Sequence, residues 1–212
     1  MGTTDVVALI PAYNAERFVE GVIREASRHV AVIAVNDGSK DGTLAVLRAS
    51  GATVIDQQPN QGKGAALKRG YRMALDAGVA AVIQLDADGQ HDPAEIPAFL
   101  RRFRETNADL VIGERQFDQM PFVRRLSNTI GRAAFSWAMG RRIDDNQSGY
   151  RLLSRRLMEA VLASGESGYE VQAMSFAGFV PVAHGAALPH LIRRFKQLKA
   201  CHVPSRTSVR AS

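Results

Sequence analysis

The stretch that decides the interpretation of the chain is Val79-Ala80-Ala81-Val82-Ile83-Gln84-Leu85-Asp86-Ala87-Asp88-Gly89-Gln90-His91. Its first part, Val79–Leu85, is almost wholly apolar, as in a strand buried on both faces of a parallel sheet. In an extended stretch, side chains at i and i+2 point the same way, so Asp86 and Asp88 can converge on one hard cation, Mg²⁺ or Mn²⁺. The structural alternative is an Asp-rich turn, or a helix cap before Pro93.

On both sides of this stretch, short apolar runs alternate with polar breaks and helical patterns, which is the signature of βαβ units. We therefore predict an α/β fold of one domain, a Rossmann-like, mostly parallel sheet flanked by helices. In such sheets ligands bind beyond the carboxyl ends of the strands. The predicted strands are Val6–Ile10, Ala31–Val35, Ala52–Ile55, Val79–Leu85 and Asp109–Ile112; the predicted helices are Glu16–Ser27, a short one from Asp41, one after Gly64, and Pro93–Thr106.

Past residue 113 the pattern is looser. It predicts a helix over Val123–Met139, a polar turn at Asp144–Gly149 and a helix near Ser154–Ala163, and it leaves the contribution of this part to the sheet open. From about Ser175 the chain is rich in Ala, Gly and Pro. We expect the last ten or so residues, with Ser, Thr and Arg throughout, to be a disordered tail.

Composition narrows the class of protein. At 212 residues, with 46% apolar and 23% charged residues, the chain is typical of a folded globular domain. It has no apolar run near the roughly 18 residues that span a bilayer, and its start lacks the features of a signal peptide, so a cytoplasmic protein is expected. The single cysteine, Cys201, agrees with a reducing compartment.

The charge is divided unevenly along the chain. Residues 1–112 hold 12 Lys and Arg against 14 Asp and Glu, net −2, whereas residues 113–212 hold 15 against 7, net +8. The second half therefore suits an anionic partner, although a basic solvated face without a partner is the alternative. Aromatic residues make up 7% and do not interleave with the basic ones, so no nucleic-acid partner is expected.

Three further motifs follow predicted strands. Asp37, in Asn36-Asp37-Gly38-Ser39, can accept a ring N–H of uracil or guanine, and Gly38 would let the ligand approach the backbone; a simple turn is the alternative. The stretch Ile10-Pro11-Ala12-Tyr13-Asn14 ends the first strand, and we expect Pro11, Tyr13 and Asn14 to contribute to the nucleotide site, with Tyr13 lining the base pocket.

The third motif, Asn60-Gln61-Gly62-Lys63-Gly64, opens a predicted helix. Its free N–H groups and Lys63 form a plausible anion site for a nucleotide's phosphates, since helix N-termini attract negative charge. The spacing matches neither the Walker motif nor the dinucleotide motif. Packing of a tight turn is the alternative explanation.

Together these motifs resemble those of the family-two glycosyltransferases, which have the GT-A fold, and within them the branch of dolichol-phosphate mannose synthase and the polyprenyl-phosphate glycosyltransferases. The ordered set covers about 140 residues and also includes Gly113-Glu114-Arg115 and Asp145-Asn146-Gln147-Ser148-Gly149-Tyr150-Arg151. Two features depart from the branch. Asn36 stands where an aspartate is usual, and the chain after about Ser175 lacks the usual closing pattern.

The resemblance implies roles for individual residues. Asp37 contacts the base; Asp86, Asp88 and Gln90 surround the metal, with Asp86 also facing the nucleotide. Arg115 and Arg124 face phosphates, together with Ser127 or Asn128, which places Asp86, Asp88, Arg115 and Arg124 in the catalytic set. The resemblance also divides the chain into a GT-A domain over residues 1–175 and a diverged C-terminal segment over residues 176–212.

The sequence thus predicts a metal-assisted glycosyltransferase that moves a hexose from a UDP- or GDP-sugar to a polyprenyl phosphate, as a cytoplasmic protein that is peripheral at the membrane face. One alternative is a protein that binds a nucleotide sugar without turnover, because the C-terminal segment has diverged. Another is a sugar nucleotidyltransferase. That class usually has a glycine-rich basic loop after its first strand, where this chain has Pro11-Ala12-Tyr13-Asn14.

Overall fold

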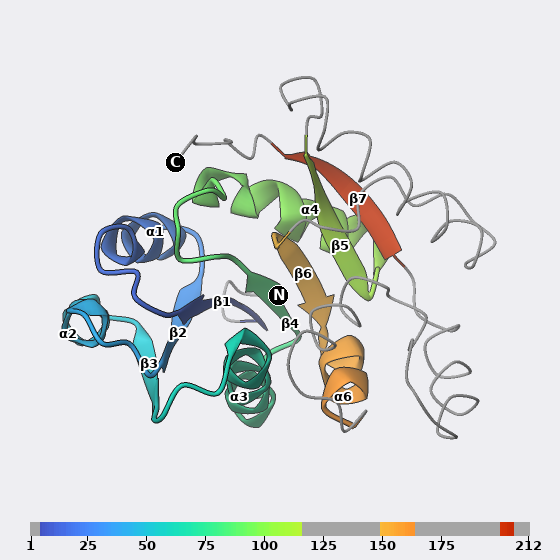
Figure 1. Cartoon of the computed structure of the whole chain (residues 1–212). Coiled ribbons are helices and arrows are strands. Elements are labelled where there is room, and N and C mark those ends of the chain that lie inside the picture. Colours follow the sequence, from blue (N-terminus) through green and yellow to red (C-terminus); the bar gives the residue numbers. More distant parts are fainter. Residues whose placement is uncertain (1–4, 116–148, 164–199, 206–212) are drawn as a thin grey trace, which may run out of the picture.

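The computed structural model describes residues 5–115, 149–163 and 200–205, and within them it forms one seven-stranded sheet (Figure 1). The strand order is β3-β2-β1-β4-β6-β5-β7. Only β6 runs antiparallel to its neighbours, so the predicted α/β class with a mostly parallel sheet is confirmed. The strands are β1 (Val6–Ala12), β2 (Ala31–Asp37), β3 (Thr53–Gln57), β4 (Ala81–Gln84), β5 (Leu110–Arg115), β6 (Arg151–Ser154) and β7 (Ala200–Ser205).

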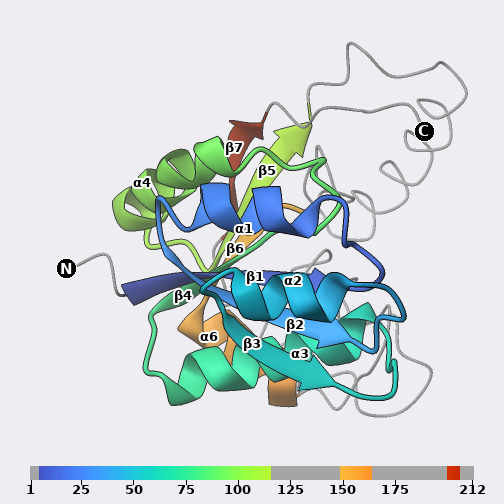
Figure 2. The ribbon, with the colours of Figure 1, turned by 90° about the vertical axis from the view of Figure 1, so that its left-hand side faces the viewer.

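Helices cover both faces of the sheet, giving three layers (Figure 2). One face carries α1 (Val19–Ala26), α2 (Thr43–Ala49) and α4 (Ile96–Thr106), the last preceded by the 3₁₀ turn η2 (Pro93–Glu95). The other face carries α3 (Lys63–Asp76) and α6 (Arg155–Ala163). None of the described helices is long and apolar enough to cross a bilayer.

The central strand β1 shows how the sequence builds two cores. Val6, Ala8 and Ile10 belong to the core under α1, whereas Val7 and Leu9 belong to the core under α3. Successive side chains of a strand point to opposite faces, so a strand covered on both sides must be apolar throughout. This is why the strands read as continuous apolar runs.

One glycine sets the distance between α3 and β1. A Cβ atom on Gly70 would overlap the side chain of Leu9. Leu9 is fully buried, so it has little room to move aside. The helix can therefore lie this close to the sheet only because residue 70 has no side chain.

Some boundaries differ from the predicted ones. Helix α1 begins at Val19 rather than Glu16. Residues 16–18 form a turn, in which the Glu16 N–H donates to Asp41 and the Glu16 carboxylate accepts the N–H of Gly42. Strand β4 is shorter than Val79–Leu85. The helix predicted over residues 123–139 lies outside the described residues, as does all but the last residue of the turn predicted at 144–149.

The second half of the chain adds strands that the sequence pattern left open. Strand β6 inserts between β4 and β5 and is antiparallel to both. Strand β7 pairs in parallel with β5 at the sheet edge and comes from the segment 176–212. It includes residues 203–205, the first three of the expected tail, while residues 206–212 lie outside the description.

Candidate active site

A cavity of about 520 Å³ opens where β1, β2 and β4 end. Because these strands are parallel, their carboxyl ends meet at one edge of the sheet, and the loops that follow them form the walls. Tyr13 stands at the rim with 48% of its surface exposed. The structure thus brings together most of the predicted site residues: Pro11, Tyr13, Asn14, Asp37, Lys63, Asp86 and Asp88.

Asp37 ends β2 on one side of β1, lines the cavity and is 3% exposed. Its Oδ1 accepts hydrogen bonds from Gln57 Nε2 at 2.5 Å and from the Gln61 N–H at 2.8 Å. Both hydrogen bonds that the described residues donate to this carboxylate end on Oδ1. Oδ2 therefore keeps its lone pairs for a ligand. Asp37 is therefore held in a fixed orientation and can accept a ring N–H of a nucleobase.

Gly38 lies beside this carboxylate with a φ of +66°. A Cβ atom there would overlap the backbone of Asn60, whose side chain donates to the Asp37 carbonyl oxygen at 2.7 Å. The structure therefore explains the glycine at position 38 by packing, whereas the sequence analysis explained it by the approach of a ligand. Gly38 lets the loop after β2 pack backbone against backbone on the loop that leads to α3.

Asn14 joins the loop after β1 to the loop after β2. Its Oδ1 accepts the Lys40 N–H at 2.8 Å, and its own N–H donates to Ser39 Oγ at 3.1 Å. The φ of +50° at Asn14 is a conformation that asparagine tolerates better than most residues. Although Asn14 lines the cavity, these bonds commit its side-chain oxygen to the structure of the rim.

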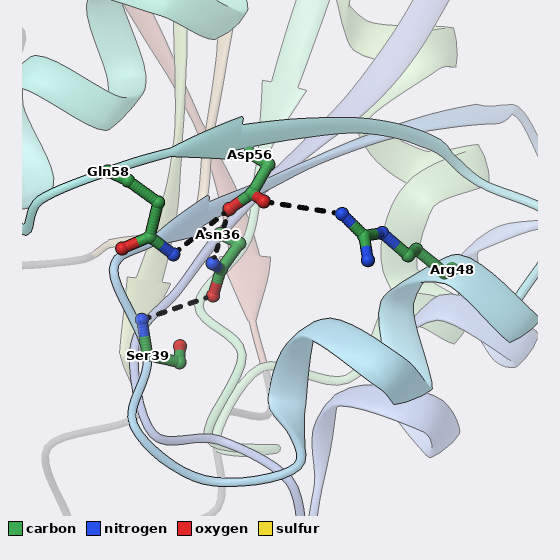
Figure 3. Close-up of polar contacts among 5 residues, drawn as sticks. All are labelled: Asn36, Ser39, Arg48, Asp56 and Gln58. Atoms are coloured by element: carbon green, nitrogen blue, oxygen red, sulfur yellow. Dashed lines mark hydrogen bonds and ion pairs between the residues drawn. The ribbon is translucent and has the colours of Figure 1, made fainter.

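Asn36, the departure from the family pattern, is fully buried next to Asp37. Its Nδ2 donates to Asp56 Oδ1 at 2.8 Å, and its Oδ1 accepts the Ser39 N–H at 3.3 Å (Figure 3). Asp56 also accepts from Gln58 at 3.2 Å and pairs with Arg48 at 3.4 Å. The Asn36 amide thus donates a hydrogen bond to the Asp56 carboxylate on β3. An ionised aspartate at position 36 has no hydrogen to donate.

Asp86 follows β4 on the other side of β1 and also lines the cavity. Lys63 Nζ lies 2.5 Å from its Oδ1, and His91 Nε2 lies 3.5 Å from its Oδ2. Burial alone raises the pKa of Asp86, but the hydrogen bond with His91 and the positive charge of Lys63 outweigh it and hold the pKa well below its ordinary value. Asp86 is therefore an anion at neutral pH.

A buried layer supports Asp86 from behind. His91 is 2% exposed and packs against Tyr150 with ring centroids 5.2 Å apart, and Tyr150 in turn stacks on Phe99 of α4. Gly149 lies against the same carboxylate: a Cβ atom there would be 2.7 Å from Asp86 Oδ2. The glycine before β6 therefore makes room for the Asp86–His91 contact.

Asp88 and Gln90 lie on the turn after β4. Asp88 is exposed, lines the cavity with Asp86 and accepts the Gln90 N–H at 2.9 Å; the exposed Gln90 is not among the residues lining the cavity. The stretch turns at Ala87 and Asp88 instead of remaining extended as predicted. Among the described residues no group of three or more His, Cys, Asp or Glu could hold a metal by itself.

These donors nevertheless fit a cation that keeps other ligands. Mg²⁺ usually takes one or two carboxylates from the protein and completes its shell with phosphate oxygens and water. Asp86 and Asp88 supply such a pair at one cavity wall. The Lys63 ammonium on Asp86 Oδ1 shows that this position accommodates positive charge.

The remaining predicted residues are placed only in part. Arg115 ends β5, which runs parallel to β1 and β4, so its backbone lies at the same edge of the sheet as the cavity. Arg124, Ser127 and Asn128 lie outside the described residues, as does Asp145.

Sequence reasoning assigned no role to several residues that shape the site. Gln57 and Gln61 orient Asp37, while His91 and Gly149 enclose Asp86. His91 and Gly149 stand inside motifs that carried the family resemblance. Their presence in these motifs was the only sign in the sequence that they belong to the site. The motifs do not indicate that both residues contact Asp86.

Comparison with known proteins agrees with this geometry. The family model described as Glycosyl transferase family 2 matches residues 7–161. An undecaprenyl-phosphate mannosyltransferase of Micrococcus luteus is 31% identical over 172 residues, covering 74% of this chain and 69% of the relative. A UDP-N-acetylglucosamine–dolichyl-phosphate N-acetylglucosaminyltransferase of Methanococcus voltae is 26% identical over 181 residues, covering 74% and 72%.

The fold is also that of a solved structure. Glucosyl-3-phosphoglycerate synthase of Mycobacterium tuberculosis, crystallised with Mn²⁺, UDP and glucosyl-3-phosphoglycerate, superposes with a TM-score of 0.68 at 21% identity, covering 99% of this chain and 72% of that one. The family match spans most of the chain and includes the cavity, and the relatives are those of the branch that the motifs resemble. The chain therefore belongs to glycosyltransferase family 2 and is a glycosyltransferase with the GT-A fold.

Proposed function

We propose that the chain transfers a hexose from a UDP- or GDP-sugar to a polyprenyl phosphate, assisted by Mg²⁺ or Mn²⁺, as a peripheral protein at the cytoplasmic membrane face. The observation that carries this proposal is that one cavity holds two different kinds of site on the two sides of β1. Asp37, at the end of β2, offers a hydrogen-bond acceptor, and Asp86 and Asp88, after β4, form a charged site with Lys63. A nucleoside diphosphate has complementary chemistry at its two ends.

At the base end, Asp37 Oδ2 would accept a ring N–H, since both uracil and guanine present one. Gln57 and Gln61 prepare this oxygen by occupying Oδ1 and so preventing the carboxylate from rotating. Tyr13, exposed at the rim, offers a ring surface beside the base. Hydrogen bonds to charged groups contribute about 1.5–3 kcal/mol, which is enough to make Asp37 the main contact of the base.

At the diphosphate end, Lys63 and the first-turn N–H groups of α3 would bind phosphate oxygens. Asp86 and Asp88 would hold the divalent cation, which when bound offsets the negative charge that develops on the departing nucleoside diphosphate. His91 and Gly149 keep Asp86 in place for this role. The Mycobacterium tuberculosis enzyme, which has the same fold, was crystallised with Mn²⁺ and UDP. This supports a divalent cation and a nucleoside diphosphate as the molecules that bind in the cavity.

For the acceptor, we propose a phosphate oxygen that needs no general base. A sugar hydroxyl must lose its proton during attack, so enzymes that use one place a base within hydrogen-bond reach. A phosphate monoester loses its second proton near pH ~6 and is already anionic. Arg115, Arg124 and Arg125 and the net +8 of residues 113–212 would hold it in line with the anomeric carbon.

Two experiments test the proposal. A thermal-shift screen with UDP- and GDP-sugars, with and without Mn²⁺, should give a metal-dependent rise in melting temperature, because a ligand of the folded state stabilises it. Asp88→Ala should abolish that metal dependence. Transfer assays should then compare polyprenyl phosphate with soluble sugar acceptors, for wild type, Arg124→Ala and Asp145→Asn. Asp145 is the candidate general base if the acceptor is instead a sugar hydroxyl, although a turn or cap residue is its alternative role. Transfer to soluble sugars alone, lost in Asp145→Asn and unaffected in Arg124→Ala, would contradict the acceptor assignment.

A further inference from the structure

We infer that Lys63 and the divalent cation compete for the same oxygen of Asp86, so that the diphosphate of the donor admits the cation by drawing Lys63 away. This inference rests on the proposed function. Its consequence is that the cation binds weakly without nucleotide and strongly with it. Lys63 would thus couple the two ligands in addition to binding phosphate.

The two oxygens of Asp86 are not equally open to a cation in the cavity. Oδ2 faces a closed wall, with His91 Nε2 at 3.5 Å and Gly149 so close that a Cβ atom would lie 2.7 Å away. Oδ1 is in contact with Lys63 Nζ at 2.5 Å, and both residues line the cavity. A cation that reaches Asp86 from the cavity therefore meets the ammonium group on Oδ1.

Lys63 can move from Asp86 to a bound diphosphate. It is the first residue of α3, next to the first-turn N–H groups that make the helix start an anion site. Its side chain is 36% exposed, so it is not locked by packing. A flexible four-carbon stem carries the ammonium group, which can exchange a carboxylate for a phosphate oxygen within one cavity.

Charge balance links the two ligands. If Lys63 moved to the diphosphate without a cation, Asp86 would lose its ion pair with Lys63 and keep only its contact with His91 beside further negative charge, which is unfavourable at low dielectric. If a cation bound without nucleotide, it would have to displace Lys63 with no anion to receive it. Each ligand therefore favours the other, and by linkage the coupling is the same in both directions.

Mn²⁺ binding to Lys63→Met measures this competition directly. Free Mn²⁺ is followed by electron paramagnetic resonance, with and without UDP. We expect Lys63→Met to bind Mn²⁺ without nucleotide about tenfold more tightly than wild type, to bind UDP more weakly, and to show about tenfold less coupling between the two ligands. Lys63→Arg, which keeps the positive charge, should stay close to wild type.

Lys40→Met is the matched control, because it removes the same charge from an exposed lysine of the neighbouring loop that is not among the residues lining the cavity. It should leave Mn²⁺ affinity within about twofold of wild type. If Lys63 had only a structural role, Lys63→Met would bind both Mn²⁺ and UDP more weakly than wild type. Equal or weaker nucleotide-free Mn²⁺ affinity in Lys63→Met than in Lys40→Met overturns the inference. The same measurement is made with GDP, and failure of the wild type to bind Mn²⁺ together with either UDP or GDP would instead overturn the proposed function.

Discussion

Replacing Asn36 with aspartate gives the residue that is usual in this branch, yet we expect it to destabilise this chain. Asn36 is fully buried and donates from Nδ2 to Asp56 Oδ1 at 2.8 Å. In Asn36→Asp the donor becomes a carboxylate oxygen that faces a second carboxylate. The hydrogen bond from the Ser39 N–H can persist, since a carboxylate accepts as the amide oxygen did.

The expected size follows from this geometry. Two unit charges about 4 Å apart repel by about 4 kcal/mol at an effective dielectric constant of about 20. Proton uptake limits the loss, because protonating a carboxyl group of ordinary pKa at neutral pH costs about 4 kcal/mol. The side chain of Asp56 is 31% exposed, so solvent screening lowers the repulsion. We therefore expect a loss of about 2–4 kcal/mol in the free energy of unfolding near pH 7.

The loss should depend on pH in a definite direction. The folded variant binds a proton between the two carboxylates more tightly than the unfolded chain does. The stability deficit is therefore largest at neutral pH and becomes smaller as the pH falls toward about 5. A protonated oxygen would again donate to Asp56, which restores the hydrogen bond.

Thermal unfolding near pH 7 and near pH 5.5 measures both effects. A loss of about 2–4 kcal/mol should lower the melting temperature by roughly 4–16 °C in a domain of this size. The exchanged pair Asn36→Asp/Asp56→Asn should recover most of it, because the amide at position 56 donates to the new carboxylate. Asp56→Asn alone should have little effect, since its pair with Arg48 is exposed. An Asn36→Asp variant as stable as wild type would refute the reasoning. So would an exchanged pair that is no more stable than Asn36→Asp alone.

Four further outcomes follow from the structure. Gly149→Ala should push Asp86 out of place and lower metal-dependent UDP affinity at least tenfold in calorimetry. It should also lower the melting temperature, because the added Cβ atom would lie 2.9 Å from Nε2 of the buried His91. Asp37→Ala should weaken nucleotide binding by about 1.5–3 kcal/mol with the fold intact; unchanged affinity would place the base elsewhere. Gly70→Ala should destabilise the fold by about 1–3 kcal/mol, whereas Gly21→Ala, on a helix face with open space, should stabilise it by about 0.5–1 kcal/mol in denaturant unfolding. The pKa of Asp86 is lower in the folded chain than in the unfolded chain, so its ionisation stabilises the fold at any pH above the unfolded pKa. The difference in melting temperature between wild type and Asp86→Asn should therefore stay constant near neutral pH. It should become smaller below about pH 4, where the unfolded chain takes up the proton.

Local patterns of the sequence were enough for the first half of the fold and for the place of the candidate site at one edge of the sheet. Apolar runs covered on both faces identify the parallel strands, and polar residues at their ends mark one edge of the sheet. Asp37, Lys63, Asp86 and Asp88 were predicted in this way and line one cavity. These four residues lie close together because parallel connections bring the carboxyl ends of successive strands to the same edge of the sheet, whatever the details of packing.

The tertiary structure alone decided which side chains meet. Gln57 orients Asp37 because β2 and β3 pair in a register that places them side by side, and Asn36 meets Asp56 for the same reason. Gly149 reaches Asp86 only because β6 inserts antiparallel beside β4. Each pair is separated by at least 20 residues. Strand register and strand order depend on the packing of the whole sheet, which no local pattern of residues encodes.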